Sequence, residues 1–181
     1  GRRSGQVLVP SFQLACEGMS EEEYIADHAT TARLVKETGA KLMVMNTSCP
    51  NEGHNRLLCH NPLLVGRITE AVKQEIGDIP LMVKLAYIPS DDALELMVRS
   101  TVGHGTVQAS APSIRFPPNW SMPMAIRPCP RGPRSLRRVR QCDSCAGLDM
   151  VARLAAIREK LGLDFAINGV GGVVSPADYQ A

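Results

Sequence analysis

The run Asn46-Thr-Ser-Cys-Pro-Asn51 holds the side chains of this chain that are best suited to chemistry. The carboxamides of Asn46 and Asn51 can each donate and accept hydrogen bonds, which suits a ring bearing alternating C=O and N–H groups. Between them Cys49 supplies a thiol whose pKa range is useful for acid–base chemistry, and Pro50 stiffens the loop. A plain strand-to-helix turn that buries a cysteine explains the same residues equally well.

Two further features fit an anionic ligand. Lys84 is the only cation in the apolar segment Leu81-Met-Val-Lys-Leu85, although a lysine at the end of a strand can also simply extend its ammonium to solvent. Near the carboxyl end, Gly169, Gly171 and Gly172 allow the backbone to approach an anion closely. Backbone N–H groups can bind a phosphate without any side chain, but a glycine-rich loop alone is weak evidence for a phosphate site.

The bulk composition predicts a globular protein. Of the 181 residues 44% are hydrophobic and 21% charged, which excludes disorder throughout the chain. No segment approaches the ~20 consecutive apolar residues that a membrane span requires. The first residues do not resemble a signal peptide, so we expect a cytoplasmic protein without a membrane partner.

The net charge of +2 is unevenly distributed. Residues 110–146 contain seven arginines and one acid, giving +6, so the rest of the chain sums to −4. This imbalance excludes a uniformly basic nucleic-acid binder and weighs against nucleic acid as a partner, while leaving a local basic arm open. Seven prolines between 112 and 133 predict that 110–146 is an irregular insertion, because proline removes a backbone donor and fixes φ.

The cysteines and histidines do not predict a metal site. Six cysteines in a chain without an export signal are expected to be free thiols. Cys142-x-x-Cys145 has metal-ligand spacing, but no second pair lies nearby. Cys59 is expected to pack as a small hydrophobic residue, and the four histidines show no metal-ligand spacing.

The elements that must position these groups alternate between strand and helix, which is typical of parallel β/α architecture. Ser20 and Glu23 have the spacing of a capping box at a helix start, and Gly39 is suited to end that helix with a positive φ. Strands are predicted over 6–12, 41–45, 81–85, 105–109 and 164–167, and helices over 20–39, 62–76, from 91 onward, and 148–161. This pattern suits an open doubly wound sheet or part of an eight-stranded barrel.

Four segments, in order, resemble the dihydroorotate dehydrogenase family. They are Ser20-Glu-Glu-Glu-Tyr24 with Thr38-Gly-Ala40, Val44-Met-Asn-Thr-Ser-Cys-Pro-Asn-Glu52, Pro80-Leu-Met-Val-Lys-Leu85, and Ile167-Asn-Gly-Val-Gly-Gly-Val-Val-Ser-Pro-Ala-Asp178. Each motif is only moderately specific, but four in the family's order are a strong signal. The resemblance covers roughly 5–109 and 147–181.

The resemblance implies FMN-dependent oxidation of dihydroorotate to orotate in pyrimidine biosynthesis. Cys49 would be the general base, as in the family's cytosolic class, while a hydride passes to FMN. Asn46 and Asn51 would hold the pyrimidine. Asn46 and Lys84 would also contact the flavin, and the glycines at 171 and 172 (Gly171, Gly172) would bind its phosphate. A homodimer or an electron-transfer subunit would be the expected protein partner.

The implied fold is an α/β TIM (β/α)8 barrel of the FMN-linked oxidoreductase type, incomplete here with about five of eight strands. Residues 1–181 would form a single partial barrel domain with the Pro/Arg-rich insertion at 110–146. Because an incomplete barrel exposes strand edges, we expect the chain alone to fold poorly and to bind FMN weakly or not at all.

The sequence also departs from the family pattern. The asparagine expected near Ala109-Ser110-Ala111 is missing, as is a glycine-rich flavin loop within 110–146. Two related FMN barrels therefore stay open as alternatives, tRNA-dihydrouridine synthase and dihydropyrimidine dehydrogenase. A barrel fragment without function is a third.

Overall fold

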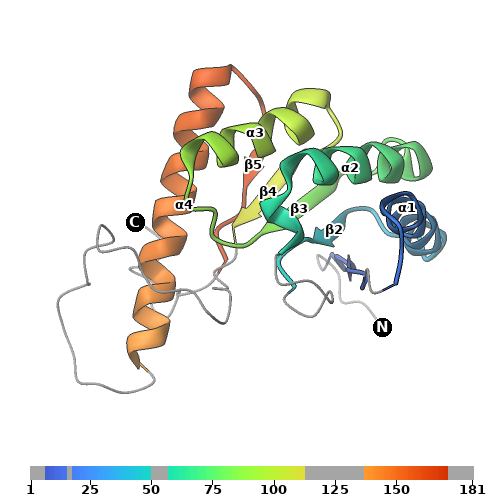
Figure 1. The fold of residues 1–181 in the computed structure, drawn as a ribbon, viewed down its shortest axis with the longest axis horizontal. Helices are drawn as coiled ribbons and strands as arrows, with labels where there is room; N and C mark the ends of the chain where they lie inside the picture. Colours follow the sequence, from blue (N-terminus) through green and yellow to red (C-terminus); the bar gives the residue numbers. More distant parts are fainter. Residues whose placement is uncertain (1–6, 16–17, 50–56, 113–136, 171–181) are drawn as a thin grey trace.

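Five parallel strands, in the order in which they occur along the chain, form the sheet of this protein (Figure 1). The structure is a computed structural model that describes residues 7–15, 18–49, 57–112 and 137–170, with side chains of the last range described from 146 onward. The strands are β1 (Ser11–Phe12), β2 (Met43–Asn46), β3 (Leu81–Leu85), β4 (Ala109–Pro112) and β5 (Ala166–Ile167).

The strand order is consistent with one of the two architectures that the sequence left open. Every crossover in the described sheet moves one strand in the same direction, from β1 to β5. A doubly wound sheet would reverse direction at a switch point. The described strands therefore form an open sheet whose order is that of a section of a β/α barrel.

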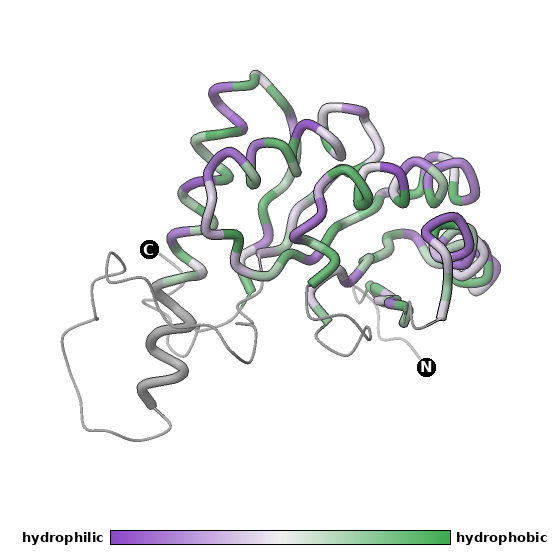
Figure 2. Tube along the Cα trace, in the orientation of Figure 1, coloured by the Kyte–Doolittle hydropathy of each residue, from purple (hydrophilic) through white to green (hydrophobic). Residues whose placement is uncertain are grey.

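The helices form one layer on this sheet. They are α1 (Glu21–Glu37), α2 (Pro62–Ile76), α3 (Asp91–Thr101) and α4 (Arg137–Leu161), with short 3-10 turns η1 (Leu58–His60) and η2 (Val102–His104). Consecutive helices pack side by side, and Figure 1 shows them along one side of the strands. Figure 2 shows β3 as mostly hydrophobic, whereas α1, α2 and α3 alternate between hydrophobic and hydrophilic residues, as helices do when one face is buried.

Local sequence signals set the helix boundaries. Ser20 accepts a hydrogen bond from the Glu23 N–H at 3.3 Å and donates its own N–H to the Glu23 carboxylate at 2.8 Å, which confirms the predicted capping box. Gly39 follows α1 with φ +80°, also as predicted. The observed α2 and β3 have the predicted bounds, because Pro62 starts α2 directly after the cap residue Asn61.

The strands bury alternate side chains under the helix layer. Met43 and Met45 of β2 are fully buried, as are Leu81, Val83 and Leu85 of β3, while the residues that alternate with them are half-buried. Each of these apolar side chains contributes about 1.5–3 kcal/mol by leaving water. The intervening positions, including Asn46, therefore belong to the sheet face opposite the helices.

Two contacts fix the spacing within the helix layer. A Cβ on Gly66 of α2 would lie 2.9 Å from the Ser100 carbonyl oxygen, so glycine permits the close approach of α2 and α3. At the surface, Arg67 of α2 forms ion pairs with Glu21 and Glu22 at the start of α1. All three of these charged side chains are substantially exposed.

Four predicted strands differ from the observed ones, and the smallest difference is at β2, predicted over 41–45 and observed at Met43–Asn46. The strand predicted over 6–12 is paired only at Ser11–Phe12, and that predicted over 164–167 only at Ala166–Ile167. The strand predicted over 105–109 instead occupies Ala109–Pro112. Gly105 explains this shift, because its φ of +73° closes the turn after α3 and the chain joins the ladder only from Gln108 onward.

The insertion predicted over 110–146 was wrong at both ends. Residues 110–112 belong to β4, and α4 begins at Arg137 and not at Leu148. The last proline of the region is Pro133, so nothing in the backbone chemistry breaks a helix between 137 and 146. Residues 113–136 lie outside the described part of the chain.

One polar group is buried without a partner among the described residues. His28 of α1 is fully buried, and its Nδ1 lies 2.9 Å from the Tyr24 carbonyl oxygen. A carbonyl only accepts, so Nδ1 carries the proton and Nε2 is left as an unpaired acceptor. Burial lowers the pKa of His28 below its usual 6.5, an effect that the Tyr24 carbonyl partly opposes.

We predict that this histidine makes the fold sensitive to acid. Because its folded-state pKa is depressed, its contribution to stability is complete above about pH 6.5 and is lost as the pH falls below that value. The free energy of unfolding in urea should therefore fall between about pH 8 and about pH 5, and His28→Phe should flatten this slope. The surface variant His104→Gln should keep the wild-type slope; an equal flattening in both variants would contradict the prediction.

Candidate active site at the carboxyl edge of the sheet

Three polar side chains lie in a row where β1, β2 and β3 end. Asn46, the last residue of β2, is paired in register with Lys84 of β3. Gln13 directly follows β1, and its side-chain oxygen accepts a hydrogen bond from the Asn46 amide nitrogen. We call Gln13, Asn46 and Lys84 the polar row. It lies at the carboxyl ends of parallel strands, where β/α folds bind their ligands.

The polar row remains accessible because it belongs to the face that the helices do not cover. Asn46 and Lys84 are half-buried and Gln13 is exposed, whereas the neighbouring positions Met45 and Val83 are buried against the helices. Carboxamides and an ammonium on one accessible surface can together serve a ring with carbonyl and N–H groups and partial negative charge. The polar row depends on the register of the strands. A shift of β2 by one residue would turn Asn46 into the helix layer and remove it from this surface.

The turn after β2 fixes the orientation of the Asn46 carboxamide. Its Oδ1 accepts hydrogen bonds from the Ser48 N–H at 3.2 Å and from the Ser48 hydroxyl at 2.8 Å. The amide nitrogen donates to Gln13 on the other side. With both ends of the carboxamide held, Asn46 is preorganised: the two bonds from Ser48 occupy the lone pairs of Oδ1, and the remaining amide N–H points in a fixed direction.

Thr47 attaches this turn to β3. Its N–H and its hydroxyl both donate to the Lys84 carbonyl oxygen, at 3.2 and 2.7 Å. The Thr47 carbonyl in turn accepts from the Cys59 N–H at 3.1 Å, so the two ends of the loop that begins at Thr47 meet. Between those ends Cys49 is buried, with an exposed fraction of 7%.

The predicted site residues therefore fall into two groups. Asn46 and Lys84 are adjacent on one surface, and Cys49 follows three residues later in the loop that Thr47 anchors. Asn51, and the glycines Gly171 and Gly172 for which we predicted phosphate binding, lie outside the described residues. The loop that leads to those glycines follows β5 at the same edge, where the Val170 N–H donates to the Pro112 carbonyl at 3.3 Å.

The sequence analysis missed Gln13, Ser48 and Asn168. Gln13 and Asn168 each come directly after a strand, as Asn46 ends one, so the rule that singled out Asn46 would have found them. Asn168 donates its N–H to Ser110, which places it beside Ala111, where the family pattern expects an asparagine on the neighbouring strand.

The other reactive residues do not form a second site within the described structure. Cys59 is buried at 1% exposure, which confirms the prediction that it packs in the core. No group of three metal-binding side chains occurs among the residues that the structure describes. The side chains of Cys142 and Cys145 lie outside them.

Comparison with known proteins gives one distant similarity. No family model matches the chain. The chain is 24% identical over 188 residues to a dihydroorotate dehydrogenase of Dictyostelium discoideum, an alignment that covers 98% of this chain and 48% of that protein. The chain thus spans about half the length of this relative. The similarity agrees with the resemblance of the four motifs. No helix in the described part of the chain is long and apolar enough to cross a membrane.

We predict that the hydroxyl of Thr47 stabilises the turn that carries the site. Thr47 is fully buried, so Thr47→Val keeps the shape but removes the bond to the Lys84 carbonyl, which should lower the free energy of unfolding in urea by about 1 kcal/mol. Thr38→Val removes a similar hydroxyl-to-carbonyl bond at an exposed position and should cost less than about 0.5 kcal/mol. Equal losses of free energy of unfolding in the two variants would contradict the prediction, because they would show that the buried Thr47 bond stabilises the fold no more than the exposed Thr38 bond.

Proposed function

We propose that this chain carries the flavin-facing and base-bearing part of a dihydroorotate dehydrogenase, an FMN-dependent oxidoreductase. The observation that carries the proposal is the pairing of Asn46 with Lys84 on the accessible face, directly before the loop that holds Cys49. The distant similarity to a dihydroorotate dehydrogenase supports the same reaction class. The sequential order of the parallel strands supports placing the site within a β/α barrel.

The donor set of the polar row fits an isoalloxazine ring. The edge of this ring bears carbonyl oxygens and ring nitrogens that gain negative charge on reduction, and an ammonium beside it stabilises that charge. Lys84 supplies the ammonium, and Asn46 supplies an oriented carboxamide whose direction Ser48 and Gln13 determine. FMN would accept a hydride at this place. The backbone at 171 and 172 would bind the phosphate, as the resemblance implies.

Cys49 would act as the base of the reaction. Oxidation of dihydroorotate removes a proton from one ring carbon and a hydride from its neighbour, which leaves a carbon–carbon double bond. The Cys49 thiolate would take the proton, while Asn46, together with Asn51, would hold the pyrimidine through its carbonyl and N–H groups. Cys49 is buried, which would keep bulk water from the thiol during the transfer; the proton would leave the thiol for solvent before the next turnover.

We expect the thiol of Cys49, and not that of Cys59, to govern turnover. In a full-length version that completes the barrel around this chain and has FMN bound, dihydroorotate should bleach the visible absorbance of the flavin, and Cys49→Ala should slow this reduction by about 10²–10⁴-fold. Cys49→Ser should retain part of the rate, increasing with pH, because serine serves as the base in the family's membrane-linked class. Cys59→Ala removes a second buried thiol near the same loop and should stay close to wild type.

The substrates used in that assay separate the competing functions. Dihydroorotate, uracil and tRNA are tested side by side with the same protein and flavin. Bleaching by dihydroorotate supports the proposal, whereas activity only with tRNA or uracil assigns the chain to one of the other two FMN barrels. Reduction that is equally fast in Cys49→Ala would remove Cys49 from the mechanism.

We further expect Lys84 to determine flavin affinity through the ring and not the phosphate. Lys84→Met should weaken FMN binding by about 10- to 100-fold, the usual weight of a hydrogen bond to a charged group. Riboflavin, which lacks the phosphate, should lose affinity by the same factor. Quenching of flavin fluorescence measures both, and Lys41→Met, at an exposed position before β2, is the matched control. Unchanged affinity in Lys84→Met would show that its ammonium does not face the ring.

A further inference from the structure

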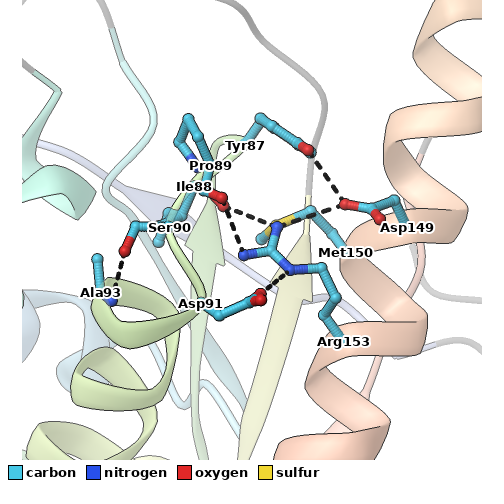
Figure 3. A network of polar contacts seen from close by, with 9 residues as sticks. All are labelled: Tyr87, Ile88, Pro89, Ser90, Asp91, Ala93, Asp149, Met150 and Arg153. Carbon is cyan, nitrogen blue, oxygen red and sulfur yellow. Dashed lines mark hydrogen bonds and ion pairs between the residues drawn. The ribbon is translucent and has the colours of Figure 1, made fainter. Parts of the chain in front are cut away.

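Arg153 of α4 binds the loop that follows β3. Its side chain is only 17% exposed, and its three nitrogens reach three different acceptors (Figure 3). One terminal nitrogen donates to the Ile88 carbonyl at 2.8 Å, the other to the Pro89 carbonyl at 3.4 Å, and Nε to the Asp91 carboxylate at 2.6 Å. The planar fork of a guanidinium is suited to several acceptors in fixed directions, which an ammonium on a flexible stem is not.

Tyr87 joins the same network through its side chain. Its hydroxyl donates to the Asp149 carboxylate at 3.1 Å, and Arg153 donates to the same oxygen at 3.3 Å (Figure 3). The guanidinium also lies 5.9 Å from the centre of the Tyr87 ring. Burial, followed by the Asp149 charge, raises the pKa of Tyr87, so its phenol remains a donor at neutral pH. We call Tyr87, Asp91, Asp149 and Arg153 the Arg153 clamp.

The loop held by the clamp contacts the candidate site on its other side. The Tyr87 carbonyl accepts from His60 Nε2 at 3.3 Å. His60 directly follows Cys59, whose N–H donates to the Thr47 carbonyl where the loop of Cys49 begins. Hydrogen bonds, connected by the backbone of Tyr87 and of Cys59-His60, thus link α4 through the loop after β3 to the loop that bears Cys49.

We propose that Arg153 is a positioning residue that holds the loop after β3 and, through His60, the loop that carries Cys49. The clamp does more than fasten α4 to its neighbours. Helix α4 already has an ion pair with α3, in which Lys160 contacts Glu95 at 2.7 Å on the surface. Arg153, besides its bonds to Asp91 and Asp149, donates to two loop carbonyls at the carboxyl edge of the sheet, which Lys160 does not reach. The role of Cys49 as the base in turnover rests on the proposed function, whereas the positioning of its loop by Arg153 does not.

Hydrogen exchange followed by mass spectrometry tests the clamp on the full chain, without flavin or substrate. In Arg153→Met, amides of 57–60 and 86–92 should exchange at least about tenfold faster, while the interior of α2, over 66–76, stays at the wild-type rate. Lys160→Met removes a different α4 cation, the one that pairs with Glu95, and should leave both segments unchanged. Acceleration confined to 86–92, or spread equally over α2, would overturn the proposal.

Conservative variants distinguish positioning from simple support of the helix. Arg153→Lys keeps the charge beside Asp149 and Asp91 but lacks the fork, so it should restore the melting temperature without restoring slow exchange at 57–60. Asp149→Asn leaves Arg153 in place and should give a smaller acceleration in the same two segments. This second variant keeps the test decisive even if Arg153→Met does not fold. Full restoration of slow exchange by Arg153→Lys would show that charge alone suffices and contradict the proposal.

A double-mutant cycle tests the route through His60. If Arg153 acts through the Tyr87 carbonyl, the effects of Arg153→Met and His60→Ala on Cys49 alkylation by iodoacetamide should be strongly non-additive. Each single variant should accelerate alkylation at Cys49 by about tenfold, and the double variant little further. Additive effects would place Arg153 outside this route. Since no arm requires turnover, an absence of dihydroorotate oxidation would refute the proposed function and leave the positioning role standing.

Discussion

The hydrogen bonds from Thr47 to the Lys84 carbonyl are the constraint on which the site depends. They continue the β2–β3 ladder one residue beyond the last paired position, Asn46 with Lys84. They fix where β2 stops being a strand and where the loop of Cys49 begins. Because the carbonyl that Thr47 binds belongs to Lys84 itself, the backbone that carries the cation also anchors the loop that carries the thiol. The two groups cannot move independently without breaking a buried bond.

The helix layer determines on which face of the sheet Asn46 and Lys84 lie. Alternate residues of β2 and β3 are buried against the helices, so the intervening Asn46 and Lys84 must occupy the opposite face. The close approach of α2 and α3 at Gly66 belongs to the same packing, since the helices that follow β2 and β3 determine how those strands sit. The alternation of apolar residues within β2 and β3 therefore determines that Asn46 and Lys84 lie on the accessible face at the carboxyl edge.

Much of this arrangement was predictable because its signals are local. Capping at Ser20, the proline at the start of α2 and the apolar run of β3 each act within a few residues, and those elements were predicted closely. The shift of β4 depended on the left-handed turn at Gly105, and the early start of α4 on a segment with almost no apolar periodicity.

The site divides in the same way. Asn46 and Lys84 were visible as polar residues in apolar strands, and the resemblance supplied their proposed roles. The partnership of Asn46 with Gln13 was not visible, because 33 positions separate them and the contact exists only once β1 and β2 pair. The Arg153 clamp joins residues 62 to 65 positions apart in the sequence, and no spacing rule reaches that far.

The contacts of Arg67 and Arg153 should differ in how strongly they weaken as the ionic strength rises, because Arg67 is exposed and Arg153 is mostly buried. The pairs of Arg67 with Glu21 and Glu22 lie in water, where added salt screens charges beyond a Debye length of about 8 Å at physiological concentration and weakens even close pairs. Arg153 also donates to the uncharged carbonyls of Ile88 and Pro89, and these hydrogen bonds depend less on salt than its pair with Asp91, whose side chain is 83% exposed. A rise in salt would thus loosen the junction of α1 and α2 before it affects the loop after β3.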